Sequence, residues 1–225
     1  MAAGLRLLSK GAEAILYLIE IDGLKLVVKQ RISKPYRHPV FDRLFRYYRT
    51  RTEAKVLTDL FLNNVNVPAV FFVDLEKYLI IMEYIHGKRL LELLGTIDDE
   101  SLKEYAFNLG KQVGIMHSIN IFHGDLTLAN IIVKDHKLYL IDFGLAGYSR
   151  DIEEYAIDIH LLRRNLLAIE PDKTNIFLEA FWEGYQHTYK GNVEEVKNRV
   201  EEIRLRGRYI EERLQRKTWG EKYIE

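Results

Sequence analysis

Two acids and an amide stand at fixed spacing in the middle of the sequence. Asp125 is followed five residues later by Asn130, and Asp142 follows the apolar run Leu138–Ile141. Residues 131–133 are also apolar, so the polar turn between the two runs predicts a short hairpin with these side chains at its open end. Two carboxylates about 5 Å apart repel by roughly 3 kcal/mol at an effective dielectric constant of about 20, so we expect a cation between them.

Hard oxygen ligands with few dedicated protein positions suit Mg²⁺ that arrives bound to a phosphate. The alternative is an acidic turn on the protein surface with no chemical role. A chance match of His, Asp, Asn, Asp, Phe and Gly at these offsets is expected about once in 10^8 start sites. The pattern therefore predicts a phosphoryl-transfer site.

The site resembles two loops of the protein-kinase superfamily. Residues 123–125 (His-Gly-Asp) with Asn130 resemble the catalytic loop of these kinases. Residues 142–144 (Asp-Phe-Gly) resemble their metal-binding loop. The resemblance implies that Asp125 accepts a hydrogen bond from the attacking hydroxyl or water. It also implies that Asn130 and Asp142 are metal ligands, and that the cofactors are ATP and Mg²⁺.

Three features depart from ordinary protein kinases. Gly124 replaces an arginine that binds an activation-loop phosphate, and His-Gly-Asp is the form seen in RIO-like and small-molecule kinases. Thr127 replaces a lysine that meets the transferring phosphate in most serine/threonine kinases. Only residues 145–151 separate Gly144 from a helix predicted near Ile152, and no Ala-Pro-Glu run follows. We therefore expect restricted chemistry: ATP hydrolysis, or phosphorylation of the chain itself or of one docked partner.

The elements before the site are predicted to hold a nucleotide. Residues 5–30 predict strands with a hairpin turn at Asp22-Gly23, and residues 9–14 precede the first of them. A single glycine at position 11 is typical of a plain turn, but small neighbours let backbone amides approach a phosphate. Lys29 is either an edge-strand lysine in water or, by the kinase resemblance, the ligand of the α- and β-phosphates paired with Glu53.

Residues 82–87 resemble the hinge between the two lobes of a kinase, although an ordinary strand end is the alternative. By the resemblance, Met82 lies behind the adenine, and the backbone of Glu83 and Ile85 hydrogen-bonds its edge. The complete set predicted to bind nucleotide is Ser9, Gly11, Ala12, Glu13, Ala14, Lys29, Glu53, Met82, Glu83 and Ile85.

A helix is predicted over residues 41–62. Its expected buried face comprises Leu44, Tyr48, Leu57, Leu60 and Phe61. The segment from Lys29 to Lys55 holds nine Lys or Arg residues against two acids, Asp42 and Glu53. This segment is either a solvated face or a patch for an anion or a nucleic-acid backbone.

The same segment resembles one kinase family in particular. Residues 29–31 (Lys-Gln-Arg), 34–39 (Lys-Pro-Tyr-Arg-His-Pro) and 49–54 (Arg-Thr-Arg-Thr-Glu-Ala) resemble the small kinase subunit of the KEOPS complex, also called the p-fifty-three-related kinase family. In that family the run Gly-Ala-Glu-Ala, here 11–14, replaces the glycine-rich loop. The resemblance covers about residues 8–210. It implies an atypical serine/threonine kinase and ATPase that supports N6-threonylcarbamoyl-adenosine modification of tRNA. The implied partners are the threonylcarbamoyl-transferase subunit, the other KEOPS subunits and, through the complex, tRNA.

The second half of the chain reads as helical. Helices are predicted over 90–94, about 97–118, from about 152, over 174–189 and over 193–216. Asp158 lies in an apolar helix, so it should accept hydrogen bonds from the catalytic-loop backbone. His117 and His123 are expected to be structural hydrogen-bonding groups. The expected core of this half includes Phe177, Phe181, Trp182 and Tyr185.

Composition excludes several classes of protein. The 225 residues include no cysteine, which excludes disulfides, thiolate zinc sites and cysteine nucleophiles. Lys+Arg and Asp+Glu number 33 each, so no net charge directs the chain to nucleic acid or membrane. No apolar run reaches the ~18 residues of a membrane helix and no signal-peptide core is present, so a cytoplasmic protein is expected. In the tail, Arg204, Arg206 and Arg208 either contact the partner subunit or tRNA, or form a plain charged helix.

The predicted fold is α+β, with the two lobes of a protein kinase. Residues 1–225 are expected to form a single domain, with an N-lobe to about residue 82, a hinge at 83–87, a C-lobe over 88–203 and a basic tail over 204–225. Two alternative functions remain: a small-molecule kinase of the aminoglycoside or choline type, and a nucleotide-binding scaffold without turnover. Lys29, Glu53, Asp125, Asn130 and Asp142 together argue against the scaffold.

Overall fold

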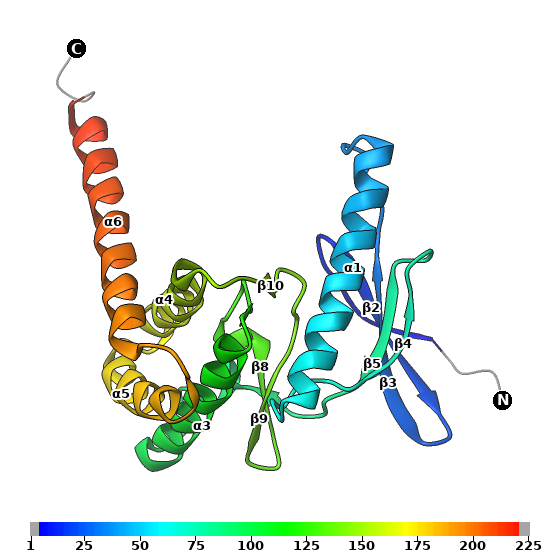
Figure 1. Cartoon of the computed structure of the whole chain (residues 1–225), viewed down its shortest axis with the longest axis horizontal. Helices are drawn as coiled ribbons and strands as arrows, with labels where there is room; N and C mark the ends of the chain where they lie inside the picture. Colours follow the sequence, from blue (N-terminus) through cyan, green and yellow to red (C-terminus); the bar gives the residue numbers. More distant parts are fainter. Residues whose placement is uncertain (1–4, 221–225) are drawn as a thin grey trace.

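The computed structural model describes the backbone of residues 5–220 and the side chains of residues 5–206. It has the predicted two-lobed α+β architecture, with a sheet and one long helix followed by a mainly helical lobe (Figure 1). Among residues 5–220, none of the helices combines the length and the apolar character that a membrane span requires.

The N-lobe is a five-stranded antiparallel sheet in the order β1-β2-β3-β5-β4. Its strands are β1 (Arg6–Lys10), β2 (Ala14–Ile21), β3 (Leu24–Arg31), β4 (Val70–Asp74) and β5 (Leu79–Glu83). The predicted hairpin is confirmed, because Asp22 and Gly23 both have positive φ (50° and 82°), which a tight two-residue hairpin turn requires. Ser9 and Lys10 belong to β1, so the phosphate-side loop is shorter than predicted and consists of residues 11–13.

The long helix α1 (Pro39–Leu62) connects β3 to β4, and the prediction of its buried face was partly wrong. Leu57 and Leu60 are buried as expected, but Leu44, Tyr48 and Phe61 are at least half exposed. The inward face instead comprises Asp42, Thr50, Glu53, Ala54, Val56, Leu57 and Leu60. The N-terminal half of α1 extends beyond its junction with the C-lobe (Figure 1). Its apolar side chains Val40, Phe41, Leu44, Tyr47 and Tyr48 are exposed.

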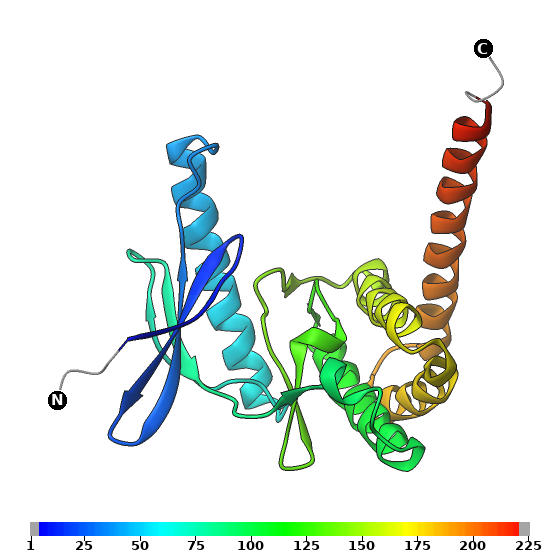
Figure 2. The ribbon, with the colours of Figure 1, turned by 180° about the vertical axis from the view of Figure 1, so that it is seen from behind.

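The C-lobe is built on three long helices and a fourth that projects from its far end (Figure 2). Its helices are α2 (Leu90–Leu93), α3 (Asp99–Ser118), α4 (Ile152–Ile169), α5 (Pro171–Thr188) and α6 (Val193–Gly220), with a 3-10 turn at Leu128–Asn130. The predicted hairpin is confirmed as β8 (Ile131–Lys134) and β9 (Lys137–Leu140), and β6 (Lys88–Arg89) extends it. A two-stranded ladder joins β7 (Ile121–Phe122) to β10 (Gly147–Tyr148).

Helices α3 and α5 pack with their backbones in close contact. A β-carbon on Gly110 would collide with the carbonyl of Phe181, and one on Gly184 would collide with the carbonyl of Phe107. The predicted aromatic core lies beside this crossing: Phe177, Phe181 and Tyr185 are fully buried, and Trp182 is partly buried. This rigid pair of helices supports the catalytic-loop region, because α3 leads directly into β7 and residues 123–130.

Candidate active site

The two lobes meet at an ion pair that joins three elements. Lys29, on β3, is 8% exposed, and its Nζ atom lies 2.5 Å from Oε1 of Glu53 on α1. The same atom lies 2.7 Å from Oδ1 of Asp142, which follows β9 in the other lobe. Burial alone would lower the pKa of Lys29, but the charges and hydrogen bonds of Glu53 and Asp142 outweigh it and raise the pKa. The lysine is therefore fully charged where it faces the second lobe.

Asp142 adopts a left-handed backbone conformation with φ of 62°. Such a conformation is uncommon for a residue with a side chain and often marks a functional site. Its side chain is 55% exposed and opens into a cavity between the lobes. Partial removal from water would raise the pKa of Asp142, but Lys29 outweighs it and lowers the pKa. The carboxylate is thus ionised and accessible to a metal ion.

Asp125 and Asn130 are tied to each other. Nδ2 of Asn130 donates to Oδ2 of Asp125 at 2.9 Å and to its backbone carbonyl at 2.9 Å. The 3-10 turn between Asp125 and Asn130 closes this loop, because the backbone N–H of Asn130 donates to the carbonyl of Thr127. Because both amide hydrogens are used, the Oδ1 atom of Asn130 is left to act as a ligand.

The donor chemistry fits a magnesium ion that shares its ligands with phosphates. Asn130 and Asp142 supply hard oxygen ligands, which Mg²⁺ prefers. Among the described residues, no three His, Cys, Asp or Glu side chains gather closely enough to hold a metal by themselves. A cation here would therefore need oxygens from its substrate, as Mg²⁺ bound to a nucleotide has.

Asp158 of α4 fixes the catalytic-loop region by accepting hydrogen bonds from its backbone, as the sequence predicted. This fully buried carboxylate accepts hydrogen bonds from the backbone N–H groups of His123 (2.6 Å) and Gly124 (2.8 Å). Nε2 of His117 lies 3.4 Å from it. His123 is structural as predicted, with Nε2 3.1 Å from the carbonyl of Ile141, next to Asp142. Burial lowers the pKa of His117 and His123, so both imidazoles are neutral near pH 7.

Gly124 meets the segment that follows Asp142. Its φ is +79°, and a β-carbon at this position would lie 2.5 Å from the carbonyl oxygen of Leu145. An arginine, as found here in ordinary protein kinases, cannot occupy this position without displacing Leu145. The departure noted in the sequence therefore has a steric cause in the short segment after Gly144.

Two adjoining cavities contain every residue predicted to bind nucleotide. The hinge cavity, about 400 Å³, lies against the hinge and has both apolar and polar walls; its apolar side includes Leu16, Val27, Leu57, Met82, Ile85, Ile132 and Ile141. Lys29, Asn130 and Asp142 also line it, and Glu53 lies behind the lysine. The apolar walls suit a flat heterocycle, with the polar groups left for its phosphates.

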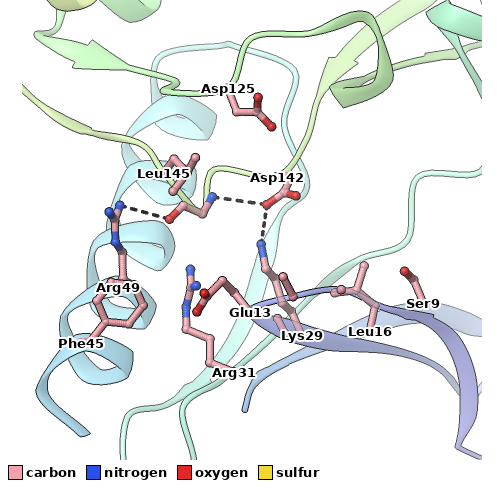
Figure 3. A pocket seen from close by; sticks show the side chains of 14 residues that line it. Ser9, Glu13, Leu16, Lys29, Arg31, Phe45, Arg49, Asp125, Asp142 and Leu145 are labelled. Atoms are coloured by element: carbon pink, nitrogen blue, oxygen red, sulfur yellow. Dashed lines mark hydrogen bonds and ion pairs between the residues drawn. The ribbon is translucent and has the colours of Figure 1, made fainter. Parts of the chain in front are cut away.

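The loop cavity, about 310 Å³, continues from the hinge cavity toward Asp125 (Figure 3). It is lined by Ser9, Gly11, Ala12, Glu13, Ala14, Leu16, Lys29, Arg31, Phe45, Arg49, Asp125, Asp142, Gly144 and Leu145. Two of the charged residues in this lining, Arg31 and Arg49, were not predicted from the sequence to belong to the site. The signals were available: Arg31 follows Lys29 at the two-residue period of a strand, and Arg49 precedes Glu53 by one helical turn.

The tail arginines lie elsewhere. On α6, Arg204 pairs with Glu201 (2.6 Å), and Arg206 pairs with Glu153 of α4 (3.1 Å). Both therefore behave as members of a charged helix surface, and neither lines the two cavities. Arg208 lies outside the residues whose side chains the structure describes.

The fold and the joined cavities define a phosphotransferase of the protein-kinase type. Residues 16–158 match the protein kinase domain family. The fold resembles that of WaaP in complex with acyl carrier protein (TM-score 0.65, 15% identity, covering 94% of this chain and 89% of that one). It also resembles the Rio2 kinase of Chaetomium thermophilum in an ADP/Mg²⁺-phosphoaspartate complex (TM-score 0.61, 14% identity, covering 93% and 72%). At these identities the two structures support the fold alone.

Closer relatives narrow the assignment. The KEOPS complex subunit Bud32 of Pyrococcus abyssi is 40% identical over 92% of this chain and 97% of its own length. The EKC/KEOPS complex subunit bud32 of Dictyostelium discoideum is 34% identical over 90% of this chain and 82% of its own length. The chain belongs to the Bud32 family of atypical kinases. A probable bifunctional tRNA threonylcarbamoyladenosine biosynthesis protein of Methanobrevibacter smithii is 36% identical over 90% of this chain, but only 36% of its own length is covered.

Proposed function

We propose that this chain is the kinase and ATPase subunit of a KEOPS complex and uses ATP with Mg²⁺. In this role it transfers the γ-phosphate of ATP to water, or to a serine or threonine of itself or of one docked partner. The observation that carries the proposal is the Lys29 amine, which bridges Glu53 in one lobe and Asp142 in the other beside Asp125 and Asn130.

Each predicted residue has a role that its surroundings support. The adenine would enter the hinge cavity in front of Met82, with the backbone of Glu83 and Ile85 at its edge. The Glu83 N–H already donates to the carbonyl of Ala69 (2.8 Å), which leaves its carbonyl and the Ile85 N–H for the base. Lys29 would bind the α- and β-phosphates, and residues 9–14 would cover them. Asn130 and Asp142 would hold Mg²⁺, which would offset the phosphate charge when bound.

Asp125 is the proposed catalytic base. Its carboxylate lines the loop cavity and is oriented by the Asn130 amide, so it can accept a hydrogen bond from an attacking hydroxyl or water. Positioning of this kind, together with charge stabilisation, supplies most of the catalysis in phosphoryl transfer. The hydrogen bonds from His123 and Gly124 to Asp158 keep the backbone that carries Asp125 in place.

A restricted choice of acceptor is supported by the short segment after Gly144. Its strand β10 pairs with β7, and the Tyr148 hydroxyl donates to Asp59 of α1 at 2.6 Å. This segment is thus fastened to both lobes and offers little length for a groove that binds loose peptides. Water or a partner docked at the site is the acceptor that we favour.

The partner, tRNA and cellular compartment are proposed from the relatives. Proteins named as KEOPS subunits and tRNA threonylcarbamoyladenosine biosynthesis proteins suggest a threonylcarbamoyl-transferase subunit as direct partner, with the other KEOPS subunits and tRNA in the same assembly. We place this activity in the cytoplasm. We further propose that residues 1–225 act as one domain, with its hinge at 83–87 and a tail from 204 that reaches the partner or tRNA.

The test is ATP turnover by the chain alone and with its partner subunit and tRNA. Asp125→Ala should lower kcat by about 10²-fold or more, because general-base catalysis contributes roughly that much, and ATP affinity should be unchanged. Asp135→Ala, in the exposed turn of the hairpin, is the matched control. A wild-type chain that binds ATP but never turns it over, alone or in the complex, would instead identify a nucleotide-binding scaffold.

A further inference from the structure

The loop cavity holds two arginines in addition to Lys29. Arg31 reaches it from β3, and Arg49 reaches it from α1, one helical turn before Glu53. Figure 3 shows both guanidinium groups directed toward the Asp142–Leu145 segment, on the same side of the cavity as the Lys29 amine. Nη2 of Arg31 and Nζ of Lys29 both come within 3.5 Å of the point where a β-carbon on Gly144 would lie. Three cations therefore surround one small space.

Arg31 is fixed by Glu53. It is 6% exposed, and its Nη2 atom lies 2.6 Å from Oε2 of Glu53, whereas Lys29 binds the other oxygen of that carboxylate. Each oxygen of Glu53 is thus occupied by a different cation. The Nε atom of Arg31 is buried and has no hydrogen-bond partner among the described residues. A buried donor without a partner is costly, so Arg31 is held in place chiefly by its ion pair with Glu53.

Arg49 has no carboxylate partner in the described part of the chain. Its Nη1 atom donates to the carbonyl of Gly144 at 3.3 Å, and its guanidinium lies 5.5 Å from the centre of the Phe45 ring. Neighbouring arginines differ, because Arg37 pairs with Glu13 and Arg46 pairs with Asp42. Arg49 therefore directs a charge that no carboxylate pairs with toward Gly144, at the edge of the loop cavity that Asp125 also lines.

The catalytic loop lacks a cation for the transferring phosphate, and Arg49 could supply one. Thr127 replaces the lysine that meets the transferring phosphate in most serine/threonine kinases. Charge on the transferring phosphoryl oxygens must still be stabilised in the transition state, and a guanidinium does this well because it binds two oxygens at once. Arg49 is the cation of the loop cavity that no carboxylate in the described residues already engages.

We propose that Arg49 is a catalytic residue that binds the transferring phosphate in place of the missing lysine. Arg31 is then a positioning residue, because it holds Glu53, which also pairs with Lys29. The inference rests on the proposed function. In the step, the bond between the γ-phosphorus and the β,γ-bridging oxygen breaks, and ADP leaves with the electron pair. The attacking oxygen bonds to phosphorus while its proton passes to Asp125. Arg49 stays protonated throughout and acts only through charge and hydrogen bonds.

The experiment compares Arg49→Ala and Arg49→Lys with Arg51→Ala in the isolated full chain. Arg51 lies on the exposed surface of the same helix and lines neither cavity, which makes it the matched control. Single-turnover ATP hydrolysis should slow by about 10²-fold in Arg49→Ala, the usual effect of losing one donor to a developing oxyanion. Arg49→Lys should recover part of the rate, and Arg51→Ala should match the wild type.

Binding of ADP with aluminium fluoride, a mimic of the transferring phosphate, separates catalysis from structure. Arg49→Ala should weaken the ADP–aluminium fluoride complex about 10²-fold while its affinity for ADP alone stays within about threefold of the wild type. An unchanged rate in Arg49→Ala, equal losses for both ligands, or the same defect in Arg51→Ala would overturn the inference. Absence of turnover in the wild type would overturn the proposed function as well, so the two failures are distinguishable.

Discussion

Replacement of Asp158 tests whether the catalytic-loop region depends on one buried carboxylate. Asp158 is fully buried and accepts from two backbone N–H groups, at 2.6 and 2.8 Å, with His117 at 3.4 Å. Asp158→Ala leaves both N–H groups buried without an acceptor. Asp158→Asn keeps one acceptor but turns its NH₂ group toward the other N–H.

The expected losses follow from the number of donors left unpaired. Each buried donor without a partner costs about 1–3 kcal/mol, so Asp158→Ala, which leaves two, should lower the free energy of unfolding by roughly 2–6 kcal/mol. Asp158→Asn leaves one donor unpaired and should lower it by about 1–3 kcal/mol. Because a domain of this kind is stable by only about 5–15 kcal/mol in total, the alanine variant should be marginal and the asparagine variant folded.

The assay combines urea unfolding with hydrogen exchange. The amides of residues 123 and 124 should exchange faster in Asp158→Asn than in the wild type, and ATP turnover should fall because Asp125 follows directly. Glu154→Gln, on the same helix but with a partly exposed side chain, is the control and should change neither quantity. An Asp158→Asn protein with wild-type stability and unchanged exchange at these two amides would refute the reasoning.

Three further predictions test the packing, the histidines and the tail. Gly110→Ala should lower the melting temperature by several degrees or prevent folding, because its β-carbon meets the Phe181 backbone, whereas Gly95→Ala, which meets only a flexible side chain, should be neutral. The lowered pKa values of His117 and His123 mean that below pH 6.5 the unfolded chain binds protons that the folded chain does not. As the pH decreases, the free energy of unfolding should therefore decrease by up to about 1.4 kcal/mol per pH unit for each histidine, measured by urea unfolding from pH 8 to 5. Removal of residues 204–225 should weaken the activity of the assembled complex and spare ATP binding by the chain.

Each of these has a contradicting result. Equal melting temperatures for both glycine variants would mean that α3 and α5 separate easily at their crossing. A flat unfolding free energy between pH 7 and 5 would show that the two buried imidazoles accept protons without cost. Full activity of a complex assembled with the shortened chain would remove residues 204–225 from the partner or tRNA interface.

The sequence predicted the parts of the molecule in which local pattern and burial coincide. The β8–β9 hairpin, the turn at Asp22-Gly23 and the buried acceptor role of Asp158 depend on alternation, turn chemistry and the cost of an unpaired charge. The kinase fold and the Bud32 family followed from spacing and resemblance, and the comparisons confirm both. The roles of Lys29, Asp125 and the other site residues stay predictions.

What the sequence missed required knowledge of which surface is covered. Apolar side chains occur all around α1, so Leu44 and Tyr48 looked as suitable for the core as Leu57. Only packing against the sheet shows that the inward face carries Glu53 and that the opposite face is bare. From the sequence, the nine basic residues from 29 to 55 were interpreted together, either as a solvated face or as a patch for an anion or a nucleic-acid backbone. In the structure these residues have different environments: some form ion pairs, and Arg49 lines the loop cavity.

The close approach of Gly124 to Leu145 couples two departures from ordinary kinases that the sequence shows separately. A side chain cannot return to position 124 while the backbone of Leu145 occupies its space. The segment that follows Gly144 is in turn attached to α1 by the hydrogen bond from Tyr148 to Asp59. A side chain at position 124 therefore requires the segment after Gly144 to move, and that movement is opposed by the attachment of the segment to α1.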